Sequence, residues 1–231
     1  MKILVINPNT SEKMTDDIRK TVEMVKGPQT EAIVASPEKG PEFLGSYYEE
    51  SIAIVETLNI VQDMREGVDA VVLACYGDPG LYALKEILDV PVVGIAEASM
   101  AIATLLGQKF SILVAVVKSI SMMHNLVQKY GFKDRLASIR PVDIPTTHLE
   151  GAEESIARRL FEVGKKTVED GAETIILGCA GLTGFDLKLQ KELGVPVIDP
   201  VKAGITLAEA LLSMQLAPSK LGLYSRPPSI R

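Results

Sequence analysis

The chain has 231 residues, of which 47% are hydrophobic and 23% charged, so it can bury a substantial core and is not a candidate for disorder. Its formal net charge is −6 and it contains no run rich in lysine or arginine, which argues against nucleic acid or an anionic membrane as a partner. No apolar run approaches the roughly 20 residues that span a bilayer, and Met1–Asn7 resembles a first buried strand more than a signal peptide, so we expect a cytoplasmic protein.

The first half of the chain alternates predicted strands and helices. Short runs of β-branched and aliphatic residues predict strands, and apolar residues at helical spacing predict the helices between them. In chain order we expect strand 3–5, helix 15–25, strand 31–35, a long loop 37–46, helix 49–64, strand 70–74, helix 79–88, strand 90–95 and helix 97–106.

The second half repeats this order. It contains strand 109–117, helix 119–130, strand 137–142, helix 150–170, strand 174–177, a helix after Thr183, strand 195–198 and helix 201–214. The tail 224–231 has the composition of a loosely held terminus. Strands that alternate with helices through short connections predict parallel sheets covered on both faces.

An internal repeat accounts for the similarity of the halves. Cys75 and Cys179 lie 104 positions apart, each between an apolar strand and a turn rich in glycine. The segments 67–70 and 171–174 align at the same spacing, and Val-Pro-Val recurs at 90–92 and 195–197. A duplication predicts two similar doubly wound α/β domains related by a pseudo-twofold axis. We assign residues 1–97, completed by about 208–231, to the first domain and residues 98–207 to the second.

The two cysteines, the only ones in the chain, are the candidate functional residues. Each is expected at the carboxyl end of a strand, where backbone N–H groups and a helix start favour negative charge. Two cysteines do not make a disulfide framework in a chain of this size. There is no CxxC motif, and His124 and His148 lie far from both cysteines in sequence, so we expect neither a metal nor a cofactor.

Paired thiols suit proton transfer at carbon. If both face one cleft, a thiolate can remove a proton from a carbon acid while a thiol protonates the opposite face, which inverts the stereocentre. The two sulfurs would then lie roughly 6–8 Å apart, too far for a disulfide. The enolate oxygen requires preorganised donors, and the backbone N–H groups of residues 76–77 and 180–181 are the candidates.

Other interpretations remain open. A cysteine after an apolar strand is often an inert core residue, although its repetition before a glycine turn favours function. A decarboxylase or isomerase needs only one thiol to protonate an enolate. A two-lobed small-molecule binding protein needs none. A hydrolase with a Ser or Cys nucleophile finds no motif around either histidine.

Four motifs carry a resemblance to a known family. They are Asn7-Pro8-Asn9-Thr10-Ser11, Cys75-Tyr76-Gly77-Asp78-Pro79-Gly80-Leu81, Gly94-Ile95-Ala96-Glu97-Ala98 and Leu177-Gly178-Cys179-Ala180-Gly181. Together they resemble the hydantoin racemase branch of the aspartate/glutamate racemase superfamily, which includes allantoin racemase. The resemblance covers nearly the whole chain, and it implies a cofactor-independent, two-base epimerisation at C5 of a 5-substituted hydantoin by a homo-oligomeric enzyme.

The resemblance also assigns site residues. It implies that Cys75 and Cys179 are the catalytic pair and that Asn9 and Thr10 help to bind the polar ring. Asn9 is equally suited to ordinary turn chemistry. The remaining candidates for contact with the small-molecule substrate are Phe43, Tyr76, Gly77, Ala180 and Gly181.

One segment departs from the family pattern. Residues 113–119 form an apolar run where relatives tend to have a threonine-containing stretch, which removes expected hydroxyl donors. Lys118 there holds an acidic substituent or reaches solvent. The substrate therefore stays open between hydantoins, allantoin and another carbon acid such as an amino acid.

Overall fold

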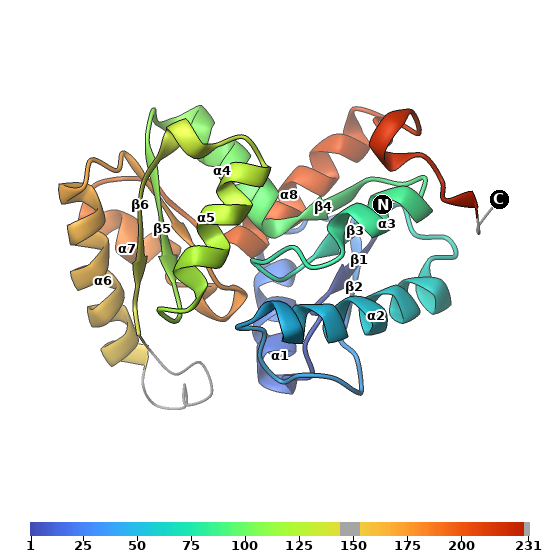
Figure 1. The fold of residues 1–231 in the computed structure, drawn as a ribbon, viewed down its shortest axis with the longest axis horizontal. Helices are drawn as coiled ribbons and strands as arrows, with labels where there is room; N and C mark the ends of the chain where they lie inside the picture. Colours follow the sequence, from blue (N-terminus) through green and yellow to red (C-terminus); the bar gives the residue numbers. More distant parts are fainter. Residues whose placement is uncertain (144–152, 229–231) are drawn as a thin grey trace. The chain divides into compact units, whose positions relative to one another are not determined.

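The computed structural model describes residues 1–143 and 153–228 (Figure 1). The chain forms two compact units, one made of Met1–Ile95 with Val201–Arg231 and the other of Ala96–Pro200. The boundaries expected from sequence, 97/98 and 207/208, lie inside helices α4 (Ile95–Leu106) and α8 (Pro200–Ser213), whereas the units divide beside the first residue of each helix. The chain therefore passes between the units where these two helices begin.

The first unit contains a parallel four-stranded sheet in the order β2-β1-β3-β4. β1 and β3 are buried along nearly their whole length, as expected for central strands covered on both faces. Its elements are β1 (Lys2–Ile6), α1 (Glu12–Val25), β2 (Glu31–Ala35), α2 (Tyr47–Met64), β3 (Ala70–Leu73), α3 (Leu81–Ile87) and β4 (Val92–Gly94), followed after the second unit by α8.

Helix α8 completes this unit through close packing on β3. A Cβ on Gly204 would lie only 2.7 Å from Cγ2 of Ile95 and 3.0 Å from Cγ1 of Val72, so only glycine allows this approach. Farther along α8, the Glu209 carboxylate accepts hydrogen bonds from the Gly27 backbone N–H at 2.8 Å and from the Thr30 hydroxyl at 2.5 Å. Residues from the two ends of the chain therefore share one core.

The C-terminal tail is attached to α3, which corrects the expectation of a loose terminus for residues 224–228. Lys220 Nζ donates hydrogen bonds to the backbone carbonyls of Lys85, Glu86 and Leu88 at the end of α3. The Tyr224 ring contacts the Tyr82 ring edge to face at 5.6 Å. The Lys220 amino group thus caps the C-terminal carbonyls of α3, where many helices end in a glycine instead. The local sequence pattern does not predict this distant cap.

The second unit repeats the topology with a parallel sheet in the order β6-β5-β7-β8. Residues 150–152 of the expected helix 150–170 lie outside the described residues. The elements of the second unit are α4, β5 (Phe110–Val114), α5 (Ser119–Lys129), β6 (Leu136–Pro141), α6 (Glu153–Glu169), β7 (Thr174–Leu177), α7 (Asp186–Leu193) and β8 (Val197–Ile198).

The predicted class is confirmed: both units are α/β, with parallel sheets and repeated strand order. Four strands are shorter than expected: β3, β4, β5 and β8. β4 begins at Val92 because the preceding Pro91 has no N–H to donate to a neighbouring strand. β5 ends at Val114, three residues before the expected end. Of the helices in the described part of the chain, none is long and apolar enough to cross a bilayer.

Candidate active site

Each cysteine lies at the carboxyl end of its parallel sheet, two residues after a central strand. β3 ends at Leu73 and β7 at Leu177, so Cys75 and Cys179 occupy the same position in the two units. In the first sheet β1 lies between β2 and β3, and in the second β5 lies between β6 and β7, so the chain changes direction beside each cysteine-bearing strand. Open α/β sheets bind ligands at such switch points.

The first cysteine turn has a tightly defined backbone. The Asp78 N–H donates to the Cys75 carbonyl at 2.9 Å, and the Leu81 N–H donates to the Asp78 carbonyl at 3.2 Å. Asp78 has φ +46°, a left-handed conformation that is costly for a residue with a side chain. A Cβ on Gly77 would lie 2.3 Å from Oε1 of Glu50, so this carboxylate from α2 packs directly over the turn.

The second cysteine turn is a short 3₁₀ helix, Ala180–Leu182, preceded by Cys179 in extended conformation. The Gly178 N–H donates to the Leu113 carbonyl at 2.7 Å, and a Cβ on Gly178 would lie 2.8 Å from that same oxygen. Glycine is therefore required where β7 passes β5. Cys179 is half-buried and packs against the core of its unit.

The surroundings of Cys179 act on its ionisation in opposite directions. Burial raises the pKa of the thiol above its ordinary value, while hydrogen bonds from the backbone N–H groups of Gly181 and Leu182 lower it. Burial is the larger effect, so the balance favours the neutral thiol over the thiolate. The same N–H groups are already aimed at the sulfur and can stabilise the thiolate when it forms.

The loop after β1 lies beside the first cysteine turn, because Ile6 pairs with Leu73. Asn9 Oδ1 accepts hydrogen bonds from Asn7 Nδ2 at 2.9 Å and from the Ser11 N–H at 3.0 Å. Its Nδ2 contacts Met14 Sδ at 3.1 Å, and a thioether is a weak acceptor. The Asn9 oxygen therefore holds the loop together, as turn chemistry requires, and the residue is only 4% exposed.

The other candidate residues lie in different environments. Thr10 is half-buried, and its N–H donates to the Pro41 carbonyl at 3.1 Å, which attaches the loop 37–46 to the loop after β1. The Phe43 ring lies on that loop and packs over Gly45. Tyr76 and Ala180 are each only 3% exposed, so both lie within the core of their units.

Within the first unit, the structure brings Asn9, Thr10, Cys75 and Gly77 to one edge of the sheet. Within the second, Cys179, Ala180 and Gly181 lie beside the residues that follow β5. Lys118 in that segment is exposed, which agrees with the interpretation that its side chain reaches solvent.

Sequence reasoning missed three carboxylates at the cysteine turns: Glu50, Asp78 and Asp199. Asp199 Oδ2 accepts hydrogen bonds from the Thr183 hydroxyl at 2.6 Å and from the Gly184 N–H at 2.8 Å. The repeat spacing of 105 that relates the Val-Pro-Val segments also aligns Asp199 with Gly94. An aspartate at a position where the other half of the repeat has a glycine is the sequence signal that could have identified Asp199.

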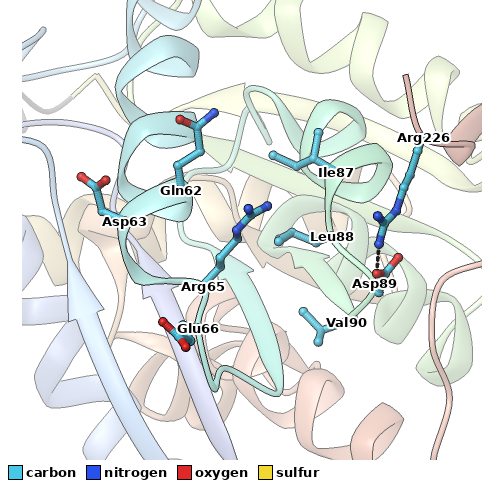
Figure 2. A pocket seen from close by; sticks show the side chains of 9 residues that line it. All are labelled: Gln62, Asp63, Arg65, Glu66, Ile87, Leu88, Asp89, Val90 and Arg226. Atoms are coloured by element: carbon cyan, nitrogen blue, oxygen red, sulfur yellow. Dashed lines mark hydrogen bonds and ion pairs between the residues drawn. The ribbon is translucent and has the colours of Figure 1, made fainter. Parts of the chain in front are cut away.

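A separate hollow of about 680 Å³ lies in the first unit (Figure 2). Figure 2 shows side chains from the end of α2 on one side and Arg226, paired with Asp89, on the other. Fifteen residues of helix separate Glu50 from Arg65, or about 22 Å along the axis, so the hollow is remote from the cysteine turn. It is lined by Gln62, Asp63, Arg65, Glu66, Ile87, Leu88, Asp89, Val90 and Arg226.

The described residues contain no cluster of three or more His, Cys, Asp or Glu side chains that could hold a metal ion.

Comparisons with known proteins identify the family. The model of the family described as Asp/Glu/Hydantoin racemase matches residues 3–208. A hydantoin racemase from Pseudomonas sp. (strain NS671) is 42% identical over 98% of this chain and 92% of its own length, and one from Paenarthrobacter aurescens is 38% identical over 98% of both. The structure of allantoin racemase from Klebsiella pneumoniae superposes with a TM-score of 0.94 at 37% identity, covering 98% of this chain and 94% of that one. The chain therefore belongs to the Asp/Glu/Hydantoin racemase family, and it is an enzyme of the racemase class.

Proposed function

We propose that this racemase inverts C5 of a 5-monosubstituted hydantoin without a cofactor, with Cys75 and Cys179 as the two acid–base groups. One observation carries the proposal: both thiols occupy the same position in the duplicated units, two residues after a central strand and before a glycine turn. Core packing gives no reason for the same reactive side chain to stand at both positions.

The proton balance of the reaction is simple. The C5–H of a hydantoin is acidic because the C4 carbonyl next to it accepts the negative charge as an enolate. One thiolate takes this proton, the enolate forms, and the thiol on the opposite face gives its proton to C5. Each turnover exchanges the protonation states of Cys75 and Cys179, so the enzyme is then ready for the reverse direction. No electron is transferred.

The environment of Cys179 fits this chemistry. Its raised pKa keeps the thiol protonated near neutral pH, as the proton donor requires, and the N–H groups of Gly181 and Leu182 lower the cost of its thiolate in the reverse direction. We assign Cys75 the resting thiolate. The backbone N–H groups at the two turns are the proposed donors to the enolate oxygen.

The polar ring requires hydrogen-bonding partners. Asn9, whose Oδ1 is engaged within its loop, offers its Nδ2 to a ring carbonyl, and Thr10 lies next to it. Phe43 covers the C5 substituent, and Tyr76, Gly77, Ala180 and Gly181 line the ring. Allantoin is itself a hydantoin with a ureido group at C5, so hydantoin and allantoin racemases among the relatives share one reacting centre.

We also propose that the protein is cytoplasmic, as its composition led us to expect, and that it is a homo-oligomer, as the family resemblance implies.

Single Cys→Ser substitutions test the two-base mechanism. Cys75→Ser and Cys179→Ser each remove one acid–base group, so racemisation of an aliphatic hydantoin such as 5-isobutylhydantoin should fall by at least about 100-fold. Polarimetry measures racemisation, and NMR in D2O measures exchange of the C5 proton. Each variant should still exchange the proton of the one enantiomer that faces its intact thiol, and the two variants should prefer opposite enantiomers.

Full racemisation by either single variant would contradict the two-base mechanism. A panel of allantoin, aromatic and aliphatic hydantoins and free Asp and Glu, assayed with the native protein, identifies the substrate class. Turnover of amino acids alone would replace the hydantoin with another carbon acid.

A further inference from the structure

Two buried carboxylates stand at the cysteine turns and have no part in the mechanism above. Asp78 and Asp199 are each only 3% exposed. Burying a carboxylate is costly unless hydrogen bonds or charges compensate, so such groups persist where their partners need them. Each lies in the unit that also contains the neighbouring cysteine.

Asp78 reaches from the first cysteine turn to the end of β4. A Cβ on Gly94 would lie 2.4 Å from Cγ, 2.5 Å from Oδ2 and 2.6 Å from Oδ1 of Asp78, so the whole carboxyl group stands over the backbone of Gly94. Gly94 is the last residue of β4, and α4 begins at the next residue. The left-handed φ of +46° at Asp78 is the conformational cost of this contact.

Asp199 makes the corresponding connection from the other side. It directly follows β8 and directly precedes α8. Its Oδ2 accepts hydrogen bonds from the Thr183 hydroxyl and the Gly184 N–H, both in the turn that follows Cys179. The side chain thus begins at the strand end and reaches the turn.

In both units, therefore, a carboxylate links the cysteine turn to the end of the neighbouring strand, but it comes from the turn in one unit and from the strand end in the other. In the repeat, Asp78 aligns with Leu182 and Gly94 aligns with Asp199. The first unit places its carboxylate on the turn and a glycine at the strand end, whereas the second places the carboxylate at the strand end. The sequences have diverged, but a carboxylate between turn and strand end is present in both. We call each aspartate with its partners a brace.

We propose that Asp78 and Asp199 are positioning residues, each holding the cysteine of its own unit in the geometry that proton transfer requires. This inference rests on the proposed function, because it gives the two thiols a shared task. Each brace holds its turn to the strand end one residue before α4 or α8, which is where the chain leaves the unit. The thiol position is thereby set within the unit.

Site-resolved alkylation tests the braces without a substrate. The full-length protein is treated with iodoacetamide, and mass spectrometry gives separate rates for Cys75 and Cys179. Asp78→Ala should change the Cys75 rate by about threefold or more and leave the Cys179 rate unchanged, and Asp199→Ala should do the reverse, because thiol reactivity follows local environment. In both variants kcat for racemisation should fall by about 10-fold to 100-fold while KM changes little.

Milder variants cover the case in which an alanine variant does not fold. Gly94→Ala leaves Asp78 in the chain but inserts a methyl group where its carboxylate stands, and Thr183→Val removes one hydrogen bond to Asp199. Each should affect only its own cysteine. Asp199→Asn, which retains an acceptor oxygen, should recover part of the loss seen with alanine.

Reversal of the first brace is the strongest control. Asp78→Gly tolerates the left-handed backbone but lacks the carboxylate, and adding Gly94→Asp supplies one from the strand end, as Asp199 does. The double variant should move the Cys75 rate back toward that of the native protein. Equal changes at both cysteines in every folded variant, or no change at either, would overturn the inference.

The outcomes separate the two claims. If each brace variant alters only its own thiol but the native protein racemises no hydantoin, the proposed substrate fails and the braces stand. If the native protein racemises hydantoins but brace variants match it in alkylation and kcat, the braces fail and the proposed function stands.

Discussion

The two candidate acid–base residues, Cys75 and Cys179, are half-buried rather than exposed. Burial raises the pKa of the Cys179 thiol, and only the N–H groups of Gly181 and Leu182 act against this. A buried thiol that stays mostly protonated is a slow nucleophile near neutral pH but is suited to protonating an enolate. In the proposed mechanism this environment assigns Cys179 the part of proton donor.

The ionisation of Cys179 can be measured in the Cys75→Ser variant, where it is the only thiol. Thiolate absorbance near 240 nm should titrate above the ordinary cysteine pKa of about 8.5, because burial disfavours the charged form. The Cys179→Ser variant is the matched control and reports Cys75 alone. A titration of Cys179 below about pH 8 would contradict the assignment of the resting thiol.

The sequence predicted the cysteine turns because duplication leaves a pattern that a reader can align. It did not predict the braces, because a buried aspartate at a turn looks like ordinary turn chemistry until its distant partner is known. Asp78 and Gly94 are 16 residues apart, and only the parallel pairing of β3 with β4 brings them together. Local pattern carries no such information.

At the scale of elements, helix starts were the least accurate part of the sequence prediction. We expected α2 to begin at Glu49, but it begins at Tyr47 with Ser46 as its cap. Ser46 and Glu49 form a capping box: the Ser46 hydroxyl accepts from the Glu49 N–H at 3.3 Å and donates to Glu49 Oε2 at 2.8 Å. The sequence pattern for this cap was present inside the segment expected to be loop.

Loss of this cap should be measurable. Ser46→Ala should lower the free energy of unfolding by about 1 kcal/mol, because an orphan N–H at the helix start loses its acceptor. The measurement is the urea midpoint followed by circular dichroism. Ser51→Ala is the matched control in the same helix, because Ser51 is exposed and bonds only to the Tyr47 carbonyl one turn back. Equal losses in both variants would show that the cap contributes nothing.

Longer-range contacts explain the other differences between expected and observed elements. The tail 224–231 was expected to be loose because its composition is typical of a terminus, whereas Tyr224 contacts Tyr82 on α3 and Arg226 pairs with Asp89. Apolar runs, by contrast, located each of the eight strands in the described part of the chain. The signal is clearest for the central strands β1, β3, β5 and β7, which are covered on both faces and buried along nearly their whole length.

At the scale of the whole molecule, one surface ion pair couples stability to pH. Asp170 accepts two hydrogen bonds from Arg140, at 2.5 and 2.7 Å, which join the end of α6 to β6. Hydrogen bonds from Arg140 and then Ser138 lower the pKa of Asp170 from 3.8 to about 2. A carboxyl group with a lowered folded pKa stabilises the protein above its unfolded pKa, and this contribution is lost as the pH falls toward the folded value.

Asp170→Asn should therefore lower the free energy of unfolding by roughly 1 kcal/mol near pH 7, since the pair is bidentate but partly exposed. The difference from the native protein should stay constant down to about pH 5 and shrink below pH 4. Urea midpoints at a series of pH values give this curve. Asp16→Asn is the control, because Asp16 is more exposed than Asp170 and its pair with Arg19 lies within one helix. A difference that grows on acidification would contradict the coupling.

The two crossings of the chain have a consequence for synthesis. The second unit is one continuous stretch, Ala96–Pro200, and is complete as soon as it leaves the ribosome. The first unit must wait, because Gly204 on α8 covers Val72 and Glu209 bonds to Gly27 and Thr30. The part translated first is thus finished last, and until α8 arrives the face of β3 stays open to chaperones and to aggregation.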